Sequence, residues 1–97
     1  MTNSQHEPET AALVERATRG DDRARQTLLI RYYERLIRMA SVRLDRRLAP
    51  RIDPADMVQE ALRLASQDLS DYLRDRPLPF HAWLRQYVGQ RISKLHR

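Results

Sequence analysis

Apolar residues recur at three- and four-residue intervals along most of the chain. The clearest case follows Asp53 and Pro54, where an apolar stripe has the spacing of one helix face. Its members are Val58, Ala61, Leu62, Ala65, Leu69 and Tyr72. Asp53 can accept bonds from the first free backbone N–H groups, and Pro54 suits the first helical position. The pattern predicts a long amphipathic helix from residue 53 that ends between residues 69 and 74.

The same periodicity predicts three further helices. One is expected over residues 10–19, and a second from residue 21 or 22 to about residue 48. A last helix is expected from residue 79 or 80 to the chain end, because Pro77 and Pro79 interrupt the helix before it. The second helix has a stripe of Leu29, Tyr33, Leu36, Ile37, Ala40 and Leu44, and the last one of Phe80, Leu84, Tyr87, Val88, Ile92 and Leu95. We expect these stripes to share one core.

The predicted fold is therefore all-α, a compact bundle of about four helices. The 97 residues allow one small domain, whose stability should be marginal. Residues 1–9 are polar and lack periodicity, so we expect a disordered tail there and the helical domain over residues 10–97. The chain has no apolar run of membrane-spanning length and no signal-peptide pattern, so we expect a cytoplasmic protein without a membrane contact.

Charge divides the chain into two parts. The formal net charge is +5, from 18 basic and 13 acidic residues, and every basic residue except Lys94 is arginine. The predicted helix start at residues 53–60 is acidic, whereas no acidic residue follows Asp75 and five basic residues do. A basic balance suits a polyanionic partner. Two partners of different charge would explain the division, and so would an ordinary solvated surface.

Residues for catalysis or metal binding are sparse. The chain has no cysteine, which excludes disulfides, thiolate metal sites and a cysteine nucleophile. Asp56 and Glu60 lie one helical turn apart, but no histidine or third carboxylate joins them in the sequence. His6, His81 and His96 do not have the spacing of metal ligands. We therefore expect no enzymatic activity, no cofactor and no metal.

Residues 53–60 read D-P-A-D-M-V-Q-E and resemble the second conserved segment of region 2 in bacterial sigma factors. The most similar group is the extracytoplasmic-function (ECF) sigma factors, in which this helix typically reads D-x-x-D-[LMV]-V-Q-E. In that family the helix docks on the clamp helices of the RNA polymerase β′ subunit. The resemblance implies that the polymerase-binding residues are Asp56, Gln59, Glu60 and Arg63. On periodicity alone, the same polar face would be a solvated helix surface.

Residues 80–91 read F-H-A-W-L-R-Q-Y-V-G-Q-R and are similar to the last conserved segments of region 2, often F-x-x-W-L-x-x-I-A-x-N-x. Val88, Gln90 and Lys94 depart from the small, Asn and Asp residues that are common there. In the family this part captures the non-template strand of the promoter minus-ten element as single-stranded DNA. The segment before the last helix, residues 70–79 here, supplies a base pocket. The resemblance implies DNA contacts by Arg74, Arg76, Gln86, Gln90, Arg91, Lys94 and Arg97.

Together the two motifs imply a transcription initiation factor domain that binds core RNA polymerase and recognises and melts the minus-ten element. Anti-sigma factors are further candidate partners. The alternative is a helical protein–protein interaction module, for example one held by an anti-sigma-type partner, that does not bind DNA. The chain ends where a linker to the family's second DNA-binding domain would begin, and both a fragment and a naturally shorter protein fit the sequence. Trp83 is expected in the core rather than stacked on a base, because apolar residues surround it at helical spacing.

Overall fold

The computed structural model describes residues 7–44, 46–47 and 49–95, and within these ranges it is helical and contains no strand. The elements are α1 (Pro8–Thr18), α2 (Asp22–Arg31), α3 (Tyr33–Arg43), the 3-10 turn η1 (Ala49–Arg51), α4 (Pro54–Asp75) and α5 (Phe80–Leu95). The predicted all-α fold is confirmed. Of the predicted tail, residues 1–6 lie outside the described residues, and α1 begins at Pro8, a residue type suited to the first turn.

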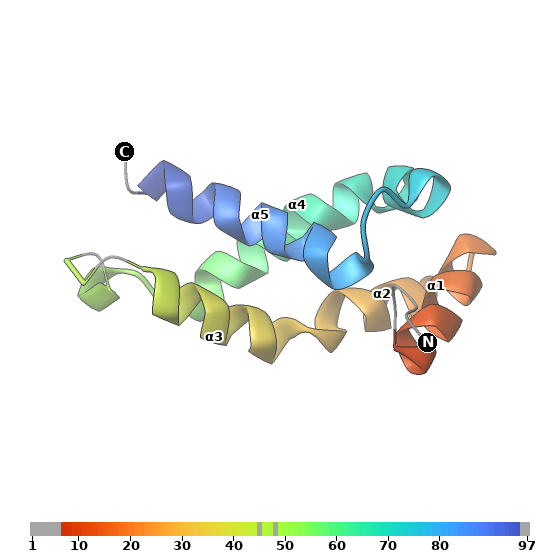
Figure 1. Ribbon diagram of the computed structural model, residues 1–97, viewed down its shortest axis with the longest axis horizontal. Coiled ribbons are helices and arrows are strands. Elements are labelled where there is room, and N and C mark those ends of the chain that lie inside the picture. The colour runs from red at the N-terminus through yellow and green to blue at the C-terminus, as the bar shows by residue number, and fades with distance from the viewer. Residues whose placement is uncertain (1–6, 45, 48, 96–97) are drawn as a thin grey trace.

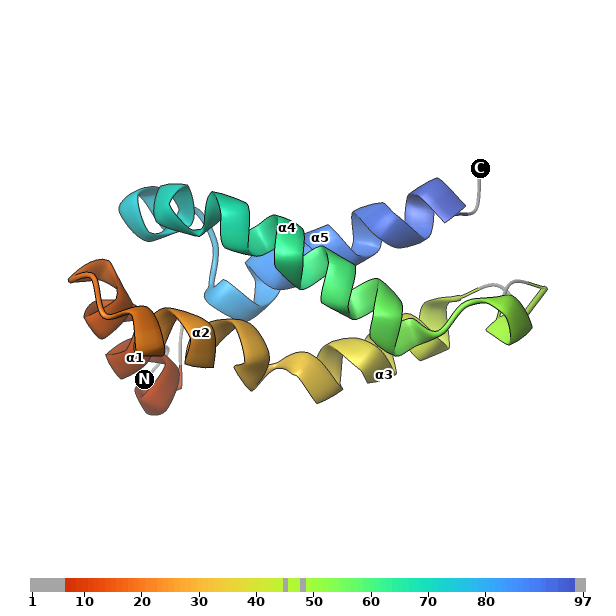
Figure 2. The same cartoon turned by 180° about the vertical axis from the view of Figure 1, so that it is seen from behind.

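The predicted second helix is divided into two. We expected one helix to about residue 48, but α2 ends at Arg31, α3 begins at Tyr33, and Arg43 is the last residue of α3. Tyr32, between them, has φ −104° and ψ 11°, which departs from regular helical geometry. The helix therefore bends in its middle, as Figures 1 and 2 show.

The spacing of the buried residues explains this break. The buried side chains repeat every four residues, as Ala24, Leu28, Tyr32, Leu36, Ala40 and Leu44. In a regular helix of about 3.6 residues per turn, such a stripe rotates by roughly 40° at each step. The break at Tyr32 resets this drift, so that both halves face the core. Leu29 and Tyr33, which we predicted in the core, are consequently only partly buried.

Helix α4 lies at the centre of the bundle and packs against each of the other four α-helices. Figure 2 shows α4 in front, crossing α5, with α2 and α3 below it. Val58 and Leu69 of α4, Leu36 of α3, and Leu84 and Val88 of α5 are almost fully buried in one cluster. The prediction that the three stripes share one core is confirmed by these residues.

An aromatic cluster joins the end of α4 to the start of α5. Trp83 is buried, and its ring centroid lies 4.6 Å from that of Tyr72 and 5.0 Å from that of Tyr87. Tyr72 also donates a hydrogen bond to the carbonyl of Leu78 at 2.7 Å, which holds the connection between the two helices. Burial raises the pKa of Tyr72 to about 12. The prediction that Trp83 is a core residue is confirmed.

Helix starts follow the sequence signals. Asp53 accepts a hydrogen bond from the Ala55 N–H at 2.9 Å, as predicted for the start of α4. Asp21 caps α2 in the same way through the Ala24 N–H at 3.1 Å, and this bond lowers the pKa of the Asp21 carboxyl. In the part of the chain that the structure describes, no helix combines the length and apolar character that a bilayer crossing requires.

Candidate functional site

The first candidate surface is the polar side of α4 near its start. Asp56 and Arg63 are exposed there, and Glu60 is half-buried. Arg63 forms a two-pronged ion pair with Glu60, with its Nε 3.0 Å from Oε1 and its Nη2 2.6 Å from Oε2. The pair lowers the pKa of Glu60 and raises that of Arg63. Such an exposed pair adds little stability, but it fixes the direction of both side chains.

Gln59 belongs to the adjacent side of α4. Its Nε2 donates to the hydroxyl of Tyr33 at 3.3 Å. Gln59 lines a hollow of about 550 Å³ between α4 and the α2–α3 pair, together with Leu62 and Ile30. Ile30 is 66% exposed and adds apolar surface to this hollow. Sequence analysis missed Ile30 and Tyr33 as parts of this surface, although an isoleucine outside the apolar stripe was an available signal.

Arg91 lies on this acidic side of the molecule, not with the other predicted DNA-binding residues of α5. It lines a hollow of about 290 Å³ with Asp53, Asp56 and Glu60 from α4. Its charge contributes to lowering the pKa of Glu60, and its buried Nε has no hydrogen-bond partner among the described residues. One residue turns a helix by about 100°, so Arg91 points away from the side that Gln90 occupies. This placement argues against the predicted DNA contact of Arg91.

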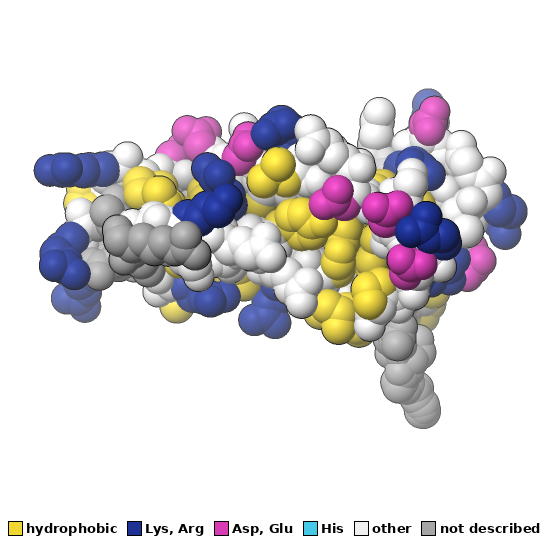
Figure 3. Space-filling model, turned by 90° about the horizontal axis from the view of Figure 1, so that it is seen from above, with side chains coloured by type: hydrophobic (Ala, Val, Ile, Leu, Met, Phe, Trp, Pro, Cys, Tyr) yellow, Lys and Arg dark blue, Asp and Glu magenta, His cyan; other side chains and the backbone are white. Residues whose placement is uncertain are grey.

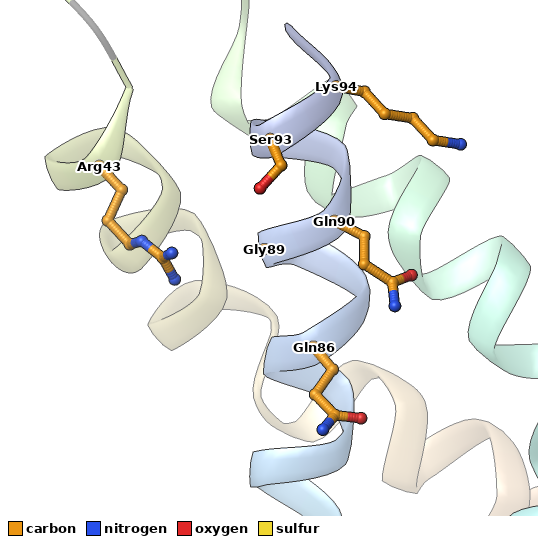
Figure 4. Close-up of a pocket in the computed structure, with 6 residues that line it drawn as sticks. All are labelled: Arg43, Gln86, Gly89, Gln90, Ser93 and Lys94. Carbon is orange, nitrogen blue, oxygen red and sulfur yellow. The ribbon is translucent and has the colours of Figure 1, made fainter. Parts of the chain in front are cut away.

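The second candidate surface is a hollow of about 570 Å³ between α5 and the end of α3 (Figure 4). Its lining consists of Arg43, Gln86, Gly89, Gln90, Ser93 and Lys94. Gln86, Gln90 and Lys94 were predicted to share a side of α5, and the structure brings them together there. None of the described residues that line this hollow carries a carboxylate. Arg97 lies outside the described residues.

Arg43 is the residue of this hollow that sequence analysis missed. In Figure 4 its side chain extends from α3 toward Gly89 of α5. Its guanidinium nitrogens lie 3.8 and 4.0 Å from the position that a Cβ on residue 89 would take. The packing of α3 against α5 creates this proximity, and no local sequence signal marks a residue 46 positions earlier in the chain as a neighbour of Gly89.

Arg74 and Arg76 lie at the far end of α4 and are engaged by other protein groups. Arg74 pairs with Asp71 and Asp75. Arg76 ends α4 in a left-handed conformation, with φ 43°. Its guanidinium donates to Glu15 at 3.0 Å and to the Thr18 hydroxyl at 2.7 Å, which ties α4 to α1. These bonds give Arg76 a structural role between α4 and α1, which argues against its predicted DNA contact.

The predicted base pocket over residues 70–79 has an acidic rim. A hollow of about 360 Å³ is present there, with walls formed by Tyr72, Pro77, Trp83 and Tyr87 and a rim formed by Asp68, Asp71 and Asp75. Tyr87 donates its hydroxyl to Asp68 at 2.6 Å, and burial together with this bond raises the pKa of Tyr87 to about 12. Aromatic walls suit a base, but three carboxylates repel a phosphate.

Charge is therefore distributed unevenly along the molecule. In Figure 3, acidic side chains gather at the right end of the view and along its upper edge, whereas lysine and arginine side chains dominate the left end. The basic left end includes the last turns of α5, and the right end includes the end of α4. Phosphate groups would thus be attracted to the α3–α5 end rather than to the connection between α4 and α5.

Metal binding has no evident place in this arrangement. Among residues 7–44, 46–47 and 49–95, no group of three or more His, Asp or Glu side chains is close enough to hold a metal ion. His81 stacks on Tyr32 with 4.7 Å between ring centroids. Its pKa is lowered by burial and by the nearby Arg35 and Arg85. These contacts make His81 part of the packing between α2–α3 and α5.

Comparison with known proteins gave one match. A family model described as ECF sigma factor matches residues 7–92, which is most of the chain. Searches of curated proteins and of solved structures returned no match. The family match includes both sequence motifs, at residues 53–60 and 80–91, and both candidate surfaces except Ser93 and Lys94.

Proposed function

The chain belongs to the ECF sigma factor family, and we propose that it binds the β′ clamp helices of core RNA polymerase through α4 and the single-stranded minus-ten element through α5. Membership of this family of non-enzymatic transcription factors supports a role in transcription initiation. The proposal assigns the two partners to the two surfaces described above.

One observation carries the polymerase half of the proposal. The exposed side of α4 contributes nothing to the domain's own core, yet it presents the Glu60–Arg63 pair in a fixed geometry. Beside this pair lies the hollow that contains Gln59 and the exposed Ile30. A polar contact next to an apolar depression is the usual composition of a protein interface. Asp56, Gln59, Glu60 and Arg63 form the proposed docking surface.

The DNA half of the proposal rests on the second surface. The hollow between α3 and α5 has cations at its edges and the amide groups of Gln86 and Gln90 along α5. Cations hold phosphates, and amides can donate to and accept from base edges. Gln86, Gln90 and Lys94 are therefore retained as proposed DNA-binding residues. Arg74 is paired with carboxylates beside the acidic hollow and would contribute less.

A pull-down with purified core RNA polymerase tests the docking surface. Glu60→Arg and Gln59→Ala should weaken retention of the chain, because the first reverses a charge of the surface and the second removes an amide from it. Asp71→Arg is the matched control, since it makes the same charge reversal on α4 outside the proposed surface. Circular dichroism of each variant should show an unchanged helical fold. Equal retention of Glu60→Arg and wild type would refute the assignment.

A protein–protein module without DNA binding is the second candidate function. The acidic rim formed by Asp68, Asp71 and Asp75 favours it, because these carboxylates lie where the family's base pocket is expected. Binding of a labelled minus-ten single strand by the polymerase complex separates the two functions. Binding that requires the chain and weakens with salt supports the sigma function, and polymerase binding without any DNA effect supports the module.

A further inference from the structure

We propose that Arg43 of α3 and Gly89 of α5 form a phosphate-binding site for the single strand. The inference rests on the proposed DNA-binding function. It adds a residue of α3 to a DNA-binding surface that otherwise consists of α5 residues. Arg43 lies outside both motifs, and Gly89, although it lies within residues 80–91, is not among the residues for which the resemblance implies a DNA contact. The site would hold one phosphodiester group against α5 and so fix the position of the strand relative to Gln86 and Gln90.

The first supporting observation is the glycine itself. Gly89 lies in the interior of α5, where glycine costs roughly 0.5–1 kcal/mol relative to alanine. Gly89 does not have a positive φ, so the backbone conformation does not require glycine. What glycine provides at position 89 is therefore the space that a side chain would occupy on the surface of α5. Without a side chain at this position, the floor of the hollow lets a strand approach the helix closely.

The second observation is the state of the Arg43 guanidinium. Several acidic residues of the described chain pair with other arginines, including Arg16, Arg31, Arg63, Arg74 and Arg76. Arg43 makes no such ion pair within the described residues, although it faces a hollow between two helices. An arginine held at the edge of a concave surface without a carboxylate is well suited to a phosphate.

The remaining lining completes the chemistry of a phosphate site. Ser93 lies one turn beyond Gly89 and points toward the Arg43 side in Figure 4, where its hydroxyl can donate to a phosphate oxygen. Lys94 supplies a second cation at the end of the hollow. The arginine, lysine and serine donors thus match the groups that hold a nucleic-acid backbone, and no carboxylate stands among the described lining residues. Gln90 remains available for a base.

Fluorescence anisotropy with a labelled oligothymidylate of about 12 nucleotides tests the site, because this probe has phosphates but no sequence signal. Arg43→Gln should weaken binding by the full chain about tenfold at low salt. It should also reduce the log–log salt slope by about 0.7. Arg23→Gln is the matched control, since it removes the same charge from an exposed residue of α2, far from the hollow.

Substitutions of Gly89 provide an independent test of the floor. Gly89→Leu should fill the hollow and weaken binding while the chain stays helical. Gly89→Ala should weaken binding less than Gly89→Leu, because its single Cβ takes up only part of the space beside Arg43 without displacing that side chain, and it should melt at a higher temperature. If the wild type binds the probe and Arg43→Gln binds equally well, the inference is overturned and the proposed function stands. If the wild type does not bind the probe at low salt, the inference and the DNA half of the proposed function are overturned, whereas the polymerase half stands or falls with the pull-down.

Discussion

Leu28 and Leu62 provide a sharp test of the packing, because both belong to apolar stripes but differ in burial. Leu28 is fully buried, with 0% exposure, whereas Leu62 is only partly buried at the edge of the hollow beside Ile30. A leucine-to-alanine change removes three carbon atoms, worth roughly 2.4 kcal/mol of burial when the side chain is fully buried. The closed cavity left at residue 28 raises the expected loss to about 3–5 kcal/mol.

For Leu62→Ala we expect a loss of only about 1–2 kcal/mol, because part of the side chain is already in water and the space it leaves is open to solvent. Urea denaturation followed by circular dichroism measures both values. With a slope of about 1–3 kcal/mol per molar urea, Leu28→Ala should lower the midpoint by at least about 1 M. The melting temperature should fall by more than about 10 °C. Equal losses for the two variants would refute the assigned position of the core.

Two further predictions concern polar groups in the core. Tyr72→Phe removes the hydrogen bond to the Leu78 carbonyl and should cost about 0.5–1.5 kcal/mol in urea denaturation. Because the folded pKa of Tyr72 is about 12 against an ordinary value of 10.0, stability should be lost as pH rises above about 10, and less so in Tyr72→Phe. The folded pKa of His81 is lowered instead, so stability should be full above about pH 6.5 and fall as pH decreases through that value. His81→Gln should flatten this fall below about pH 6.5; an unchanged profile would contradict the partial burial of His81.

Local signals predicted the helices well. The cap at Asp53, the prolines at 77 and 79, and the apolar stripes of α4 and α5 act within a few residues, and the structure confirms them except for Leu95, which was predicted in the stripe of α5 and is exposed. The break at Tyr32, in contrast, could not be predicted from local signals. Leu28 and Leu29 are both apolar, and so are Tyr32 and Tyr33, so the sequence allowed two stripes. The packing of α2 and α3 against α4 selects the one with four-residue spacing.

The candidate surfaces were predictable only where one helix forms them. Asp56, Glu60 and Arg63 share a side of α4 by spacing alone. Arg76 could not be placed this way, because its partners Glu15 and Thr18 are 61 and 58 residues away in the sequence. Among the arginines after residue 75, the resemblance implied DNA contacts by Arg76, Arg91 and Arg97. The structure shows that two of them, Arg76 and Arg91, face acidic groups of the protein instead.

Photocrosslinking to core RNA polymerase tests the central claim most directly. A photoreactive side chain in place of Gln59 would lie on the proposed docking surface, beside the Glu60–Arg63 pair and the exposed Ile30. The same group in place of Asp22, which is exposed on α2, is the control. The account predicts a crosslink to the β′ clamp helices from position 59 and none from position 22. A crosslink to another subunit, or equal β′ products from the two positions, would contradict it.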